Sequence, residues 1–232
     1  MSDDPLSRSI LLEELLDHGA IAFESRSSVP PQSLHPDEAV AVTRAVPKRL
    51  EEFATGRACA RRALERLGIT QYPLRVGADR EPLWPAGIAG SITHTRGFCA
   101  AAVARCAECA SLGIDAEPSD SVHARLWRTI ATEAELAQLA GLPERAAWER
   151  ATLLFSAKES FFKCQYPLTR QWLNFRDVSV SIEAHTYRIE PQRRIALEPR
   201  APAPWVGRHA LREGLVITAM SLPGPALRPS NA

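Results

Sequence analysis

The sequence has no long apolar stretch and almost no net charge. A membrane-spanning helix needs about 20 consecutive apolar residues, and no segment of this chain is that apolar over that length. Lys and Arg number 28 against 27 Asp and Glu, so no overall field favours nucleic acid or an anionic membrane. The first residues, MSDDPLSRS, lack the apolar core of a secretory signal. These absences predict a cytoplasmic protein that binds neither nucleic acid nor membrane.

Several common functional motifs are missing as well. There is no G-x-x-x-x-G-K phosphate loop, no G-x-G-x-x-G dinucleotide loop, and no G-x-S-x-G elbow for a nucleophilic serine. The five cysteines are an odd number in a chain too large to need disulfides. Cys106 and Cys109 form one C-x-x-C pair without the second pair or histidine spacing of a zinc site. A reduced compartment, with the cysteines as small apolar residues, is the favoured interpretation.

The composition that remains is that of a globular protein, 45% hydrophobic and 24% charged, in 232 residues that could form one domain or two. Helical spacing predicts helices at Ile10–Leu16, from Pro36 through Val46, at Pro47–Leu67, and from about Thr132 to Gln165 with a break near Gly141 and Pro143. Alternating patterns predict strands at Phe98–Ala104, Ala110–Ile114, Val178–Ile182 and Leu215–Leu222.

Three stretches indicate irregular connections because they are rich in Pro, Gly or Ser. They are Ser25–Pro36, Tyr72–Gly90 and the Pro-rich segment between the last two predicted strands. Helices and strands therefore do not alternate as regular βαβ units. An α+β fold is favoured over a doubly wound α/β fold.

Two carboxylates lie in the segment Gly113–Pro118. In an extended chain alternate residues point the same way, so Asp115 and Glu117 share a face while Ile114 points into the core. Two neighbouring acids repel unless a cation lies between them, and magnesium takes one or two carboxylates together with substrate phosphates. On its own, such a pair more commonly marks a solvated strand end.

A second polar group lies in the predicted helix at Phe155–Lys163. Glu159 and Lys163 are four residues apart and share a helix face, as in an ordinary surface ion pair. The surrounding phenylalanines predict that this stretch is largely buried, and Lys or Glu is rarely buried without a partner. Lys158, Glu159 and Lys163 are therefore candidates for a functional site.

A third group follows the interrupted stretch, at Gly90–Thr95. Gly90 allows the backbone close to a ligand, and Ser91, Thr93 and His94 supply small donors. His94 alone is more often a hydrogen-bonded structural residue than a ligand-binding one.

Taken together, five motifs resemble those of the Sfp-like 4′-phosphopantetheinyl transferases of the enterobactin-synthetase type. They are Gly56–Arg61, Arg80–Pro85, Gly90–His94, Gly113–Glu117 and Phe155–Ser160, in this order, and the similarity runs from about Leu34 to Leu222. The resemblance implies two similar α+β subdomains related by a pseudo-twofold, with coenzyme A in the cleft between them. We accordingly expect an N-terminal extension at residues 1–33 and subdomains at residues 34–109 and 110–232.

The same resemblance assigns roles to individual residues. It implies that Asp115, Glu117 and Glu159 hold Mg²⁺, with Mn²⁺ possible, and that Glu159 is the base, directly or through a water on the metal. The residues that it implies contact coenzyme A are Arg49, Arg57, Arg80, Ser91, Thr93, His94, Asp115, Lys158 and Lys163. It places Ser91 and Thr93 in a loop beside the diphosphate. Asp115, Glu159 and Lys163 would be the catalytic group.

The implied reaction moves phosphopantetheine from coenzyme A to a serine of an apo acyl or peptidyl carrier protein and releases adenosine 3′,5′-bisphosphate. The carrier would serve siderophore, polyketide or nonribosomal peptide synthesis, and one chain containing both halves would act as a monomer. Two alternatives stay open: a non-catalytic scaffold that kept the fold, and another metal-dependent phosphotransferase or hydrolase acting on a small nucleotide.

Overall fold

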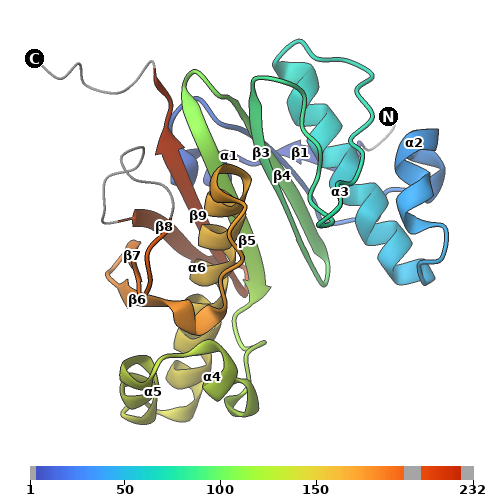
Figure 1. Ribbon diagram of the computed structural model, residues 1–232. Helices are drawn as coiled ribbons and strands as arrows, with labels where there is room; N and C mark the ends of the chain where they lie inside the picture. Colours follow the sequence, from blue (N-terminus) through green and yellow to red (C-terminus); the bar gives the residue numbers. More distant parts are fainter. Residues whose placement is uncertain (1–3, 196–204, 226–232) are drawn as a thin grey trace, which may run out of the picture. The chain divides into compact units, whose positions relative to one another are not determined.

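The computed structural model describes residues 4–195 and 205–225, and the chain divides into two units (Figure 1). Unit 2 is Ser111–Leu222, and the described part of unit 1 is residues 4–110 with residues 223–225. The chain thus leaves unit 1 at Ser111 and returns to it at Pro223, where the Gly224 amide donates to the Glu108 carbonyl at 2.7 Å. Unit 2 is an insertion in unit 1, and each unit is described below by itself.

Unit 1 is an antiparallel sheet with one long helix packed on it. The sheet has the order β1-β2-β4-β3, and α3 contacts β2, β3 and β4. The elements are β1 (Leu6–Arg8), α1 (Ile10–Leu16), β2 (Ile21–Ser25), a 3₁₀ turn (Pro31–Ser33), α2 (Pro36–Ala39), a second 3₁₀ turn (Val40–Val42), α3 (Pro47–Arg66), β3 (Ile88–Thr95) and β4 (Phe98–Arg105).

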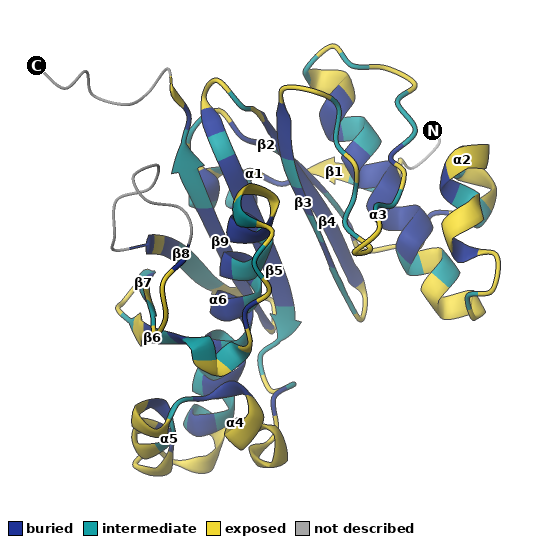
Figure 2. Cartoon of the chain, in the orientation of Figure 1, coloured by how far each residue is buried: buried dark blue, intermediate teal, exposed yellow. Residues whose placement is uncertain are grey.

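Small side chains let α3 lie close to this sheet. Strand β4 is buried along almost its whole length (Figure 2), and its core-facing Ala101 and Val103 form one cluster with Ala60, Ala63 and Leu64 of α3. Apolar residues three and four apart on one helix face, against alternate residues of a strand, produce this kind of contact. The core of unit 1 therefore lies between α3 and the centre of its sheet.

The first 33 residues differ from the extension that we expected. Strand β1 pairs with β2, and β2 pairs with β4 in a register that aligns Phe23 with Ala101. The helix expected at Ile10–Leu16 is present with the same bounds. The segment thus completes the sheet of unit 1, and the division of the chain falls between Ala110 and Ser111, beside the boundary expected after residue 109.

Two other expectations for unit 1 were wrong. The helix from Pro36 ends as α-helix at Ala39, because a 3₁₀ turn follows it, and Pro47 starts a separate helix. The segment Gly90–Thr95 is no loop but most of strand β3, whose register places Ser91 opposite Ala102 and Thr93 opposite Ala100. Pairing with a buried partner strand outweighs the weak local pattern of this segment.

Unit 2 repeats the plan of a long helix on an antiparallel sheet. The sheet has the order β5-β9-β8-β7-β6, with β5 shared at its start with unit 1. The elements are β5 (Cys109–Pro118), α4 (Ala124–Ile130), α5 (Glu133–Ala140), α6 (Glu144–Thr169), a 3₁₀ turn (Phe175–Asp177), β6 (Val178–Ile182), β7 (Thr186–Pro191), β8 (Trp205–Arg212) and β9 (Leu215–Pro223). The α+β prediction is confirmed.

Helix α6 is the centre of unit 2, with α4 and α5 packed against it (Figure 1). The predicted helical break is confirmed: α5 ends at Ala140, Gly141 follows, and Pro143 caps the start of α6. The apolar face of α6 carries Leu154 and Phe161 into a cluster with the sheet residues Tyr187 and Ile189. Part of the Pro-rich segment expected before β9, residues 196–204, lies outside the described residues.

Among residues 4–195 and 205–225, no helix is both long enough and apolar enough to cross a membrane. Helix α6 has the length, but it carries charged side chains throughout.

Candidate functional site

The acidic strand β5 lies against helix α6 within unit 2. The face of β5 that carries Asp115 also carries Ser111 and Gly113, because strand residues alternate. Ser111 donates its hydroxyl to the Cys164 carbonyl at 2.6 Å. A Cβ at Gly113 would lie 2.0 Å from the carbonyl oxygen of Ser160. Only glycine fits there, and this close approach brings the acids of β5 to the helix turn that carries Glu159 and Lys163.

Lys163 and Asp115 form the central ion pair of this site. The Lys163 ammonium lies 2.7 Å from Asp115 Oδ1 and 3.2 Å from the Ile114 carbonyl oxygen. Burial lowers the pKa of Lys163, but the carboxylates of Asp115 and Glu159 outweigh burial, and the net pKa is raised. The ammonium therefore stays protonated while it faces the acids.

The other two acids hold protons more tightly than usual. Burial, followed by the Asp115 carboxylate, raises the pKa of Glu117 to about 7. Burial also raises the pKa of Glu159, where Lys163 opposes it and Asp115 adds to it. Burial is the larger cause of both pKa shifts, and the Asp115 carboxylate adds to each of them. The three predicted metal ligands thus lie near enough to perturb one another.

This donor set fits a hard divalent cation in its chemistry. Carboxylate oxygens are the ligands that Mg²⁺ prefers, and a cation would lower both raised pKa values. The arrangement is not a preformed metal cage: within the described ranges, no three His, Cys, Asp or Glu side chains are placed to hold a metal ion together. In this arrangement Asp115 Oδ1 is engaged by Lys163.

Lys158 does not face this site, which corrects our expectation that it contacts the diphosphate. It is only 2% exposed, and its ammonium donates to the Ile130 carbonyl, the Glu135 carboxylate and the Phe175 carbonyl, at 2.9, 2.7 and 2.9 Å. A lysine ammonium has three donors, so these three acceptors use them all. On a helix, residues 158 and 159 point in different directions, which separates Lys158 from Glu159.

In unit 1, the predicted cations Arg49 and Arg57 of α3 lie near enough to repel each other, and Arg49 also contacts His94. Arg49 Nη1 contacts the His94 Nε2 atom. Arg57 is buried: its Nε donates to the Leu74 carbonyl at 3.0 Å, and its guanidinium lies 4.0 Å from the centre of the Phe53 ring. Burial lowers the pKa of Arg57 to about 10, and Arg49 and Arg61 add to this effect. Mutually repelling cations on one helix face are suited to a multiply charged anion.

A buried acid that we had not singled out for the site fixes part of this group. Glu38 is fully buried, accepts from the Leu74 amide at 2.9 Å, and forms an ion pair with Arg61. It therefore holds the same segment whose carbonyl orients Arg57. In the sequence Glu38 looked only like a first-turn helix acid.

The remaining predicted residues of unit 1 have different settings. Arg80 is exposed in a turn, with a φ of 66°. Ser91 and Thr93 are buried at 4% and 2% exposure in β3. Their hydroxyls therefore lie inside a strand. The expectation that Ser91 and Thr93 sit in a loop was wrong, because they belong to β3.

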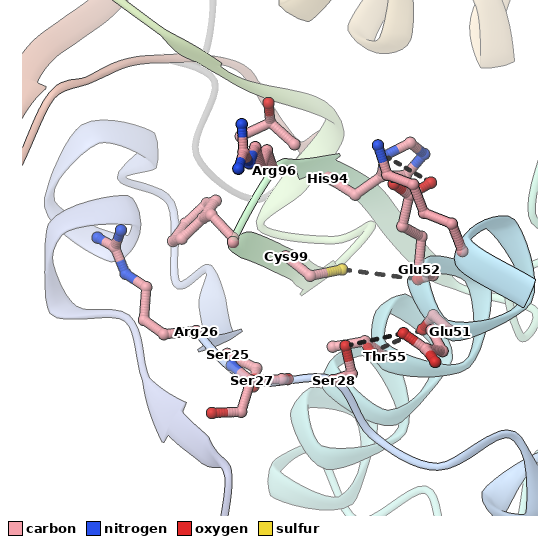
Figure 3. Close-up of a pocket in the computed structure, with 14 residues that line it drawn as sticks. Ser25, Arg26, Ser27, Ser28, Glu51, Glu52, Thr55, His94, Arg96 and Cys99 are labelled. Atoms are coloured by element: carbon pink, nitrogen blue, oxygen red, sulfur yellow. Dashed lines mark hydrogen bonds and ion pairs between the residues drawn. The ribbon is translucent and has the colours of Figure 1, made fainter.

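A cavity of about 220 Å³ lies beside His94 in unit 1. Figure 3 shows Arg26 and Arg96 on one side of it and the α3 acids Glu51 and Glu52 on the other. Its lining comes from the end of β2, the first half of α3 and the β3–β4 turn. The sequence pointed only to His94, since segments far apart in the chain meet here.

Comparisons with known proteins match both units of the chain to models of one family. The model described as "4'-phosphopantetheinyl transferase N-terminal domain" matches residues 37–104, and the model described as "4'-phosphopantetheinyl transferase superfamily" matches residues 111–218. The first match contains Arg49, Arg57 and His94, and the second contains the acids and Lys163. Both family models thus describe one class of enzyme, the 4'-phosphopantetheinyl transferases.

Relatives cover most of the chain. The 4'-phosphopantetheinyl transferase Svp of Streptomyces mobaraensis is 44% identical over 211 residues, which is 88% of this chain and 85% of that protein. PptT of Mycobacterium tuberculosis is 35% identical over 228 residues, 98% of this chain and 91% of that protein. Enterobactin synthase component D of Escherichia coli is 41% identical over 120 residues, 50% of this chain and 54% of that protein. The chain therefore belongs to the 4′-phosphopantetheinyl transferase family.

Proposed function

We propose that this chain transfers 4′-phosphopantetheine from coenzyme A to a serine of an apo acyl or peptidyl carrier protein, releasing adenosine 3′,5′-bisphosphate. The observation that carries the proposal is the grouping of Asp115, Glu117, Glu159 and Lys163 where β5 meets α6. A phosphoryl group transferred between two oxygens needs neutralised charge and a proton acceptor. This group of residues offers both.

Asp115, Glu117 and Glu159 would hold Mg²⁺, or Mn²⁺ in its place. When bound, the cation would supply positive charge to the diphosphate of coenzyme A. The support is the donor chemistry together with the raised pKa values of Glu117 and Glu159, which a neighbouring cation would relieve.

Glu159 would take the proton of the carrier's serine as its oxygen attacks the phosphorus attached to pantetheine. It is half-buried on α6, and its carboxylate lies near the Lys163 ammonium, which favours the ionised form. Lys163 would stabilise the charge that develops on the leaving bisphosphate. Its ammonium has three donors, of which Asp115 and Ile114 use two.

The cations of unit 1 would hold the phosphates at the adenosine end of coenzyme A. Arg49 and His94 are in contact and half-exposed. Arg57 is buried, and burial disfavours its charged form and lowers its pKa to about 10. The exposed Arg80 would add charge at the surface. Ser91 and Thr93 would act from inside β3 by fixing the strand that carries His94. The cavity beside His94 leaves room for that end of the ligand.

The partner would be a carrier protein, and the chain would act as a cytoplasmic monomer. The relatives named as enterobactin synthase component D favour siderophore synthesis, with polyketide and nonribosomal peptide carriers as further candidates. Exposed cations on α4, Arg125 and Arg128, would suit an acidic carrier surface.

The test is to incubate the chain with coenzyme A, Mg²⁺ and a panel of apo carriers, and to weigh the carriers by intact-protein mass spectrometry. We expect at least one carrier to gain one phosphopantetheinyl group, and to gain none with a chelator or with its acceptor serine changed to alanine. Bisphosphate release without any carrier would indicate a hydrolase instead. Magnesium-dependent binding of coenzyme A with no transfer to any carrier would favour the scaffold alternative.

A further inference from the structure

Lys158 and Glu135 form a closed polar network inside unit 2. Both side chains are almost fully buried, at 1% and 2% exposure, and the ammonium lies 2.7 Å from Glu135 Oε2. The other two donors of Lys158 go to the carbonyls of Ile130 and Phe175. The lysine thereby ties α6 to the end of α4, to α5 and to the 3₁₀ turn before β6.

Glu135 completes the network from the other side. Its Oε2 also accepts from the Thr132 amide at 2.7 Å, as part of the capping box of α5. Its Oε1 accepts from the Val180 amide at 2.7 Å, which reaches β6. One carboxylate and one ammonium therefore connect α4, α5, α6, the 3₁₀ turn and the edge strand of the sheet.

Such a pair is a poor source of stability. Removing two charges from water costs about as much as their attraction returns, and apolar side chains of the same volume often stabilise a core equally well. What a buried pair with directional hydrogen bonds does supply is a defined position, since the ammonium must meet three acceptors at once. The position fixed here is that of residue 158 on α6.

The next residue on the helix is Glu159. Anchoring Lys158 to the core fixes how α6 is rotated about its axis at this turn and where the turn lies along that axis. Lys163 lies five residues further along the same helix. Displacing a reacting group by about 1 Å can cost roughly 100-fold in rate.

We propose that Lys158 and Glu135 are a positioning pair, which holds the Glu159–Lys163 turn of α6 against β5 without touching coenzyme A. The inference rests on the proposed function, because the rate it affects is that of phosphopantetheine transfer. It deepens that function by assigning the lysine of the A-K-E-S segment to the scaffold of the site.

The experiment compares Lys158→Met, Glu135→Gln and the double variant with the wild-type chain. The double variant removes both charges and nearly preserves volume, so it avoids an unpaired buried ion if Lys158→Met alone fails to fold. Thr152→Val is the matched control, because it deletes a buried hydrogen bond from the Val122 amide to Thr152 on the same helix, outside the turn that carries Glu159. We measure thermal unfolding, coenzyme A affinity by calorimetry with Mg²⁺, and kcat and KM for transfer.

We expect the double variant to fold, to bind coenzyme A within about 3-fold of wild type, and to lose at least about 10-fold in kcat. Hydrogen exchange in residues 157–163 should rise in the double variant and stay unchanged in Thr152→Val, whose kcat should remain within about 2-fold. These values follow from a role in position and not in binding.

Two results would overturn the proposal. A loss of about 10-fold or more in coenzyme A affinity would mean that Lys158 contacts the ligand, and wild-type kcat with unchanged exchange would mean that the pair only fills space. Failure of the proposed function looks different, since the wild-type chain itself would then load no carrier. The affinity and exchange measurements would still decide the role of the pair.

Discussion

The ammonium of Lys163 on α6 lies 2.7 Å from the carboxylate of Asp115 on β5. This pair joins the two elements that carry every predicted catalytic group of unit 2, and it is sheltered from solvent on the Asp115 side, at 5% exposure. Its consequence for activity is direct. Lys163→Met should lower kcat by about 100- to 1000-fold, the usual cost of one preorganised charge at a reacting centre. Lys163→Arg should keep part of the rate, whereas equal losses in both variants would contradict a role for the charge.

Glu159→Gln should abolish most transfer while leaving coenzyme A binding in place. The amide keeps the shape of the side chain but cannot accept the serine proton, and general-base catalysis is worth about 10²- to 10⁴-fold. Steady-state kinetics with a carrier and calorimetry with coenzyme A check the two halves of this prediction. Glu149→Gln is the control, since Glu149 lies on the same helix and pairs with Arg145 one turn before it. Wild-type turnover of Glu159→Gln would remove it as the base.

The raised pKa of Glu117 predicts how stability depends on pH without metal. Its pKa is about 7 in the folded chain against an ordinary 4.5, so the folded chain binds more protons between these values. Its contribution is therefore full below about pH 4.5 and is lost as the pH rises through about 7. In chelator, the fall in Tm from about pH 6 to about pH 8 should be smaller in Glu117→Gln than in wild type.

Added Mg²⁺ should reverse this trend if Glu117 is a ligand. Metal binding needs the ionised carboxylate, so the rise in Tm on adding Mg²⁺ should be larger near pH 8 than near pH 6. Glu117→Gln should reduce that rise at the higher pH. An identical magnesium effect at both pH values, in both proteins, would argue against ligation.

Gly113 should be intolerant of any side chain. A Cβ there would lie 2.0 Å from the Ser160 carbonyl and 2.7 Å from the Cys164 amide nitrogen, both backbone atoms of α6. Gly113→Ala should therefore push β5 from the helix, cost about 1–3 kcal/mol in the free energy of unfolding, and lower kcat. Gly141→Ala is a matched control, because its Cβ would lie 3.7 Å from the Gln138 carbonyl oxygen, an ordinary contact distance. Chemical denaturation compares the two variants.

Arg49 should distinguish coenzyme A from its 3′-dephospho form. If the Arg49–His94 pair holds the 3′-phosphate, Arg49→Ala should raise KM for coenzyme A by about 10- to 100-fold, as for a lost charged hydrogen bond. KM for the dephospho form should hardly change. Arg62→Ala, at a half-exposed position of the same helix where Arg62 pairs with Asp4, serves as the control. An equal rise in KM for both substrates would place Arg49 away from that phosphate.

Local patterns in the sequence were enough for the elements that carry the acids. The D-x-E spacing put Asp115 and Glu117 on one strand face, and the i, i+4 spacing put Glu159 and Lys163 on one helix face. What local patterns could not supply is the partner across space. Lys158 looked equivalent to Lys163 because both flank Glu159, yet it faces Glu135, which lies 23 residues away in the chain.

The same reason explains the misplaced segment at Gly90–Thr95. Its small polar residues are typical of a loop, but Ser91 and Thr93 are covered by pairing with β4. Strand β2 was missed because its short run at Ile21–Ser25 becomes a central strand only through β1 and β4 on either side. Long-range pairing decides these cases, and a single sequence contains little record of it.

The insertion of unit 2 has a topological consequence for dissecting the protein. The chain crosses between the units at residues 110–111 and again at residues 222–223, by way of β5 and β9, which are neighbours in one sheet. A protease nick at either crossing leaves the two units covalently joined through the other. Releasing unit 2 takes both cuts, and the fragment would begin and end on adjacent strands.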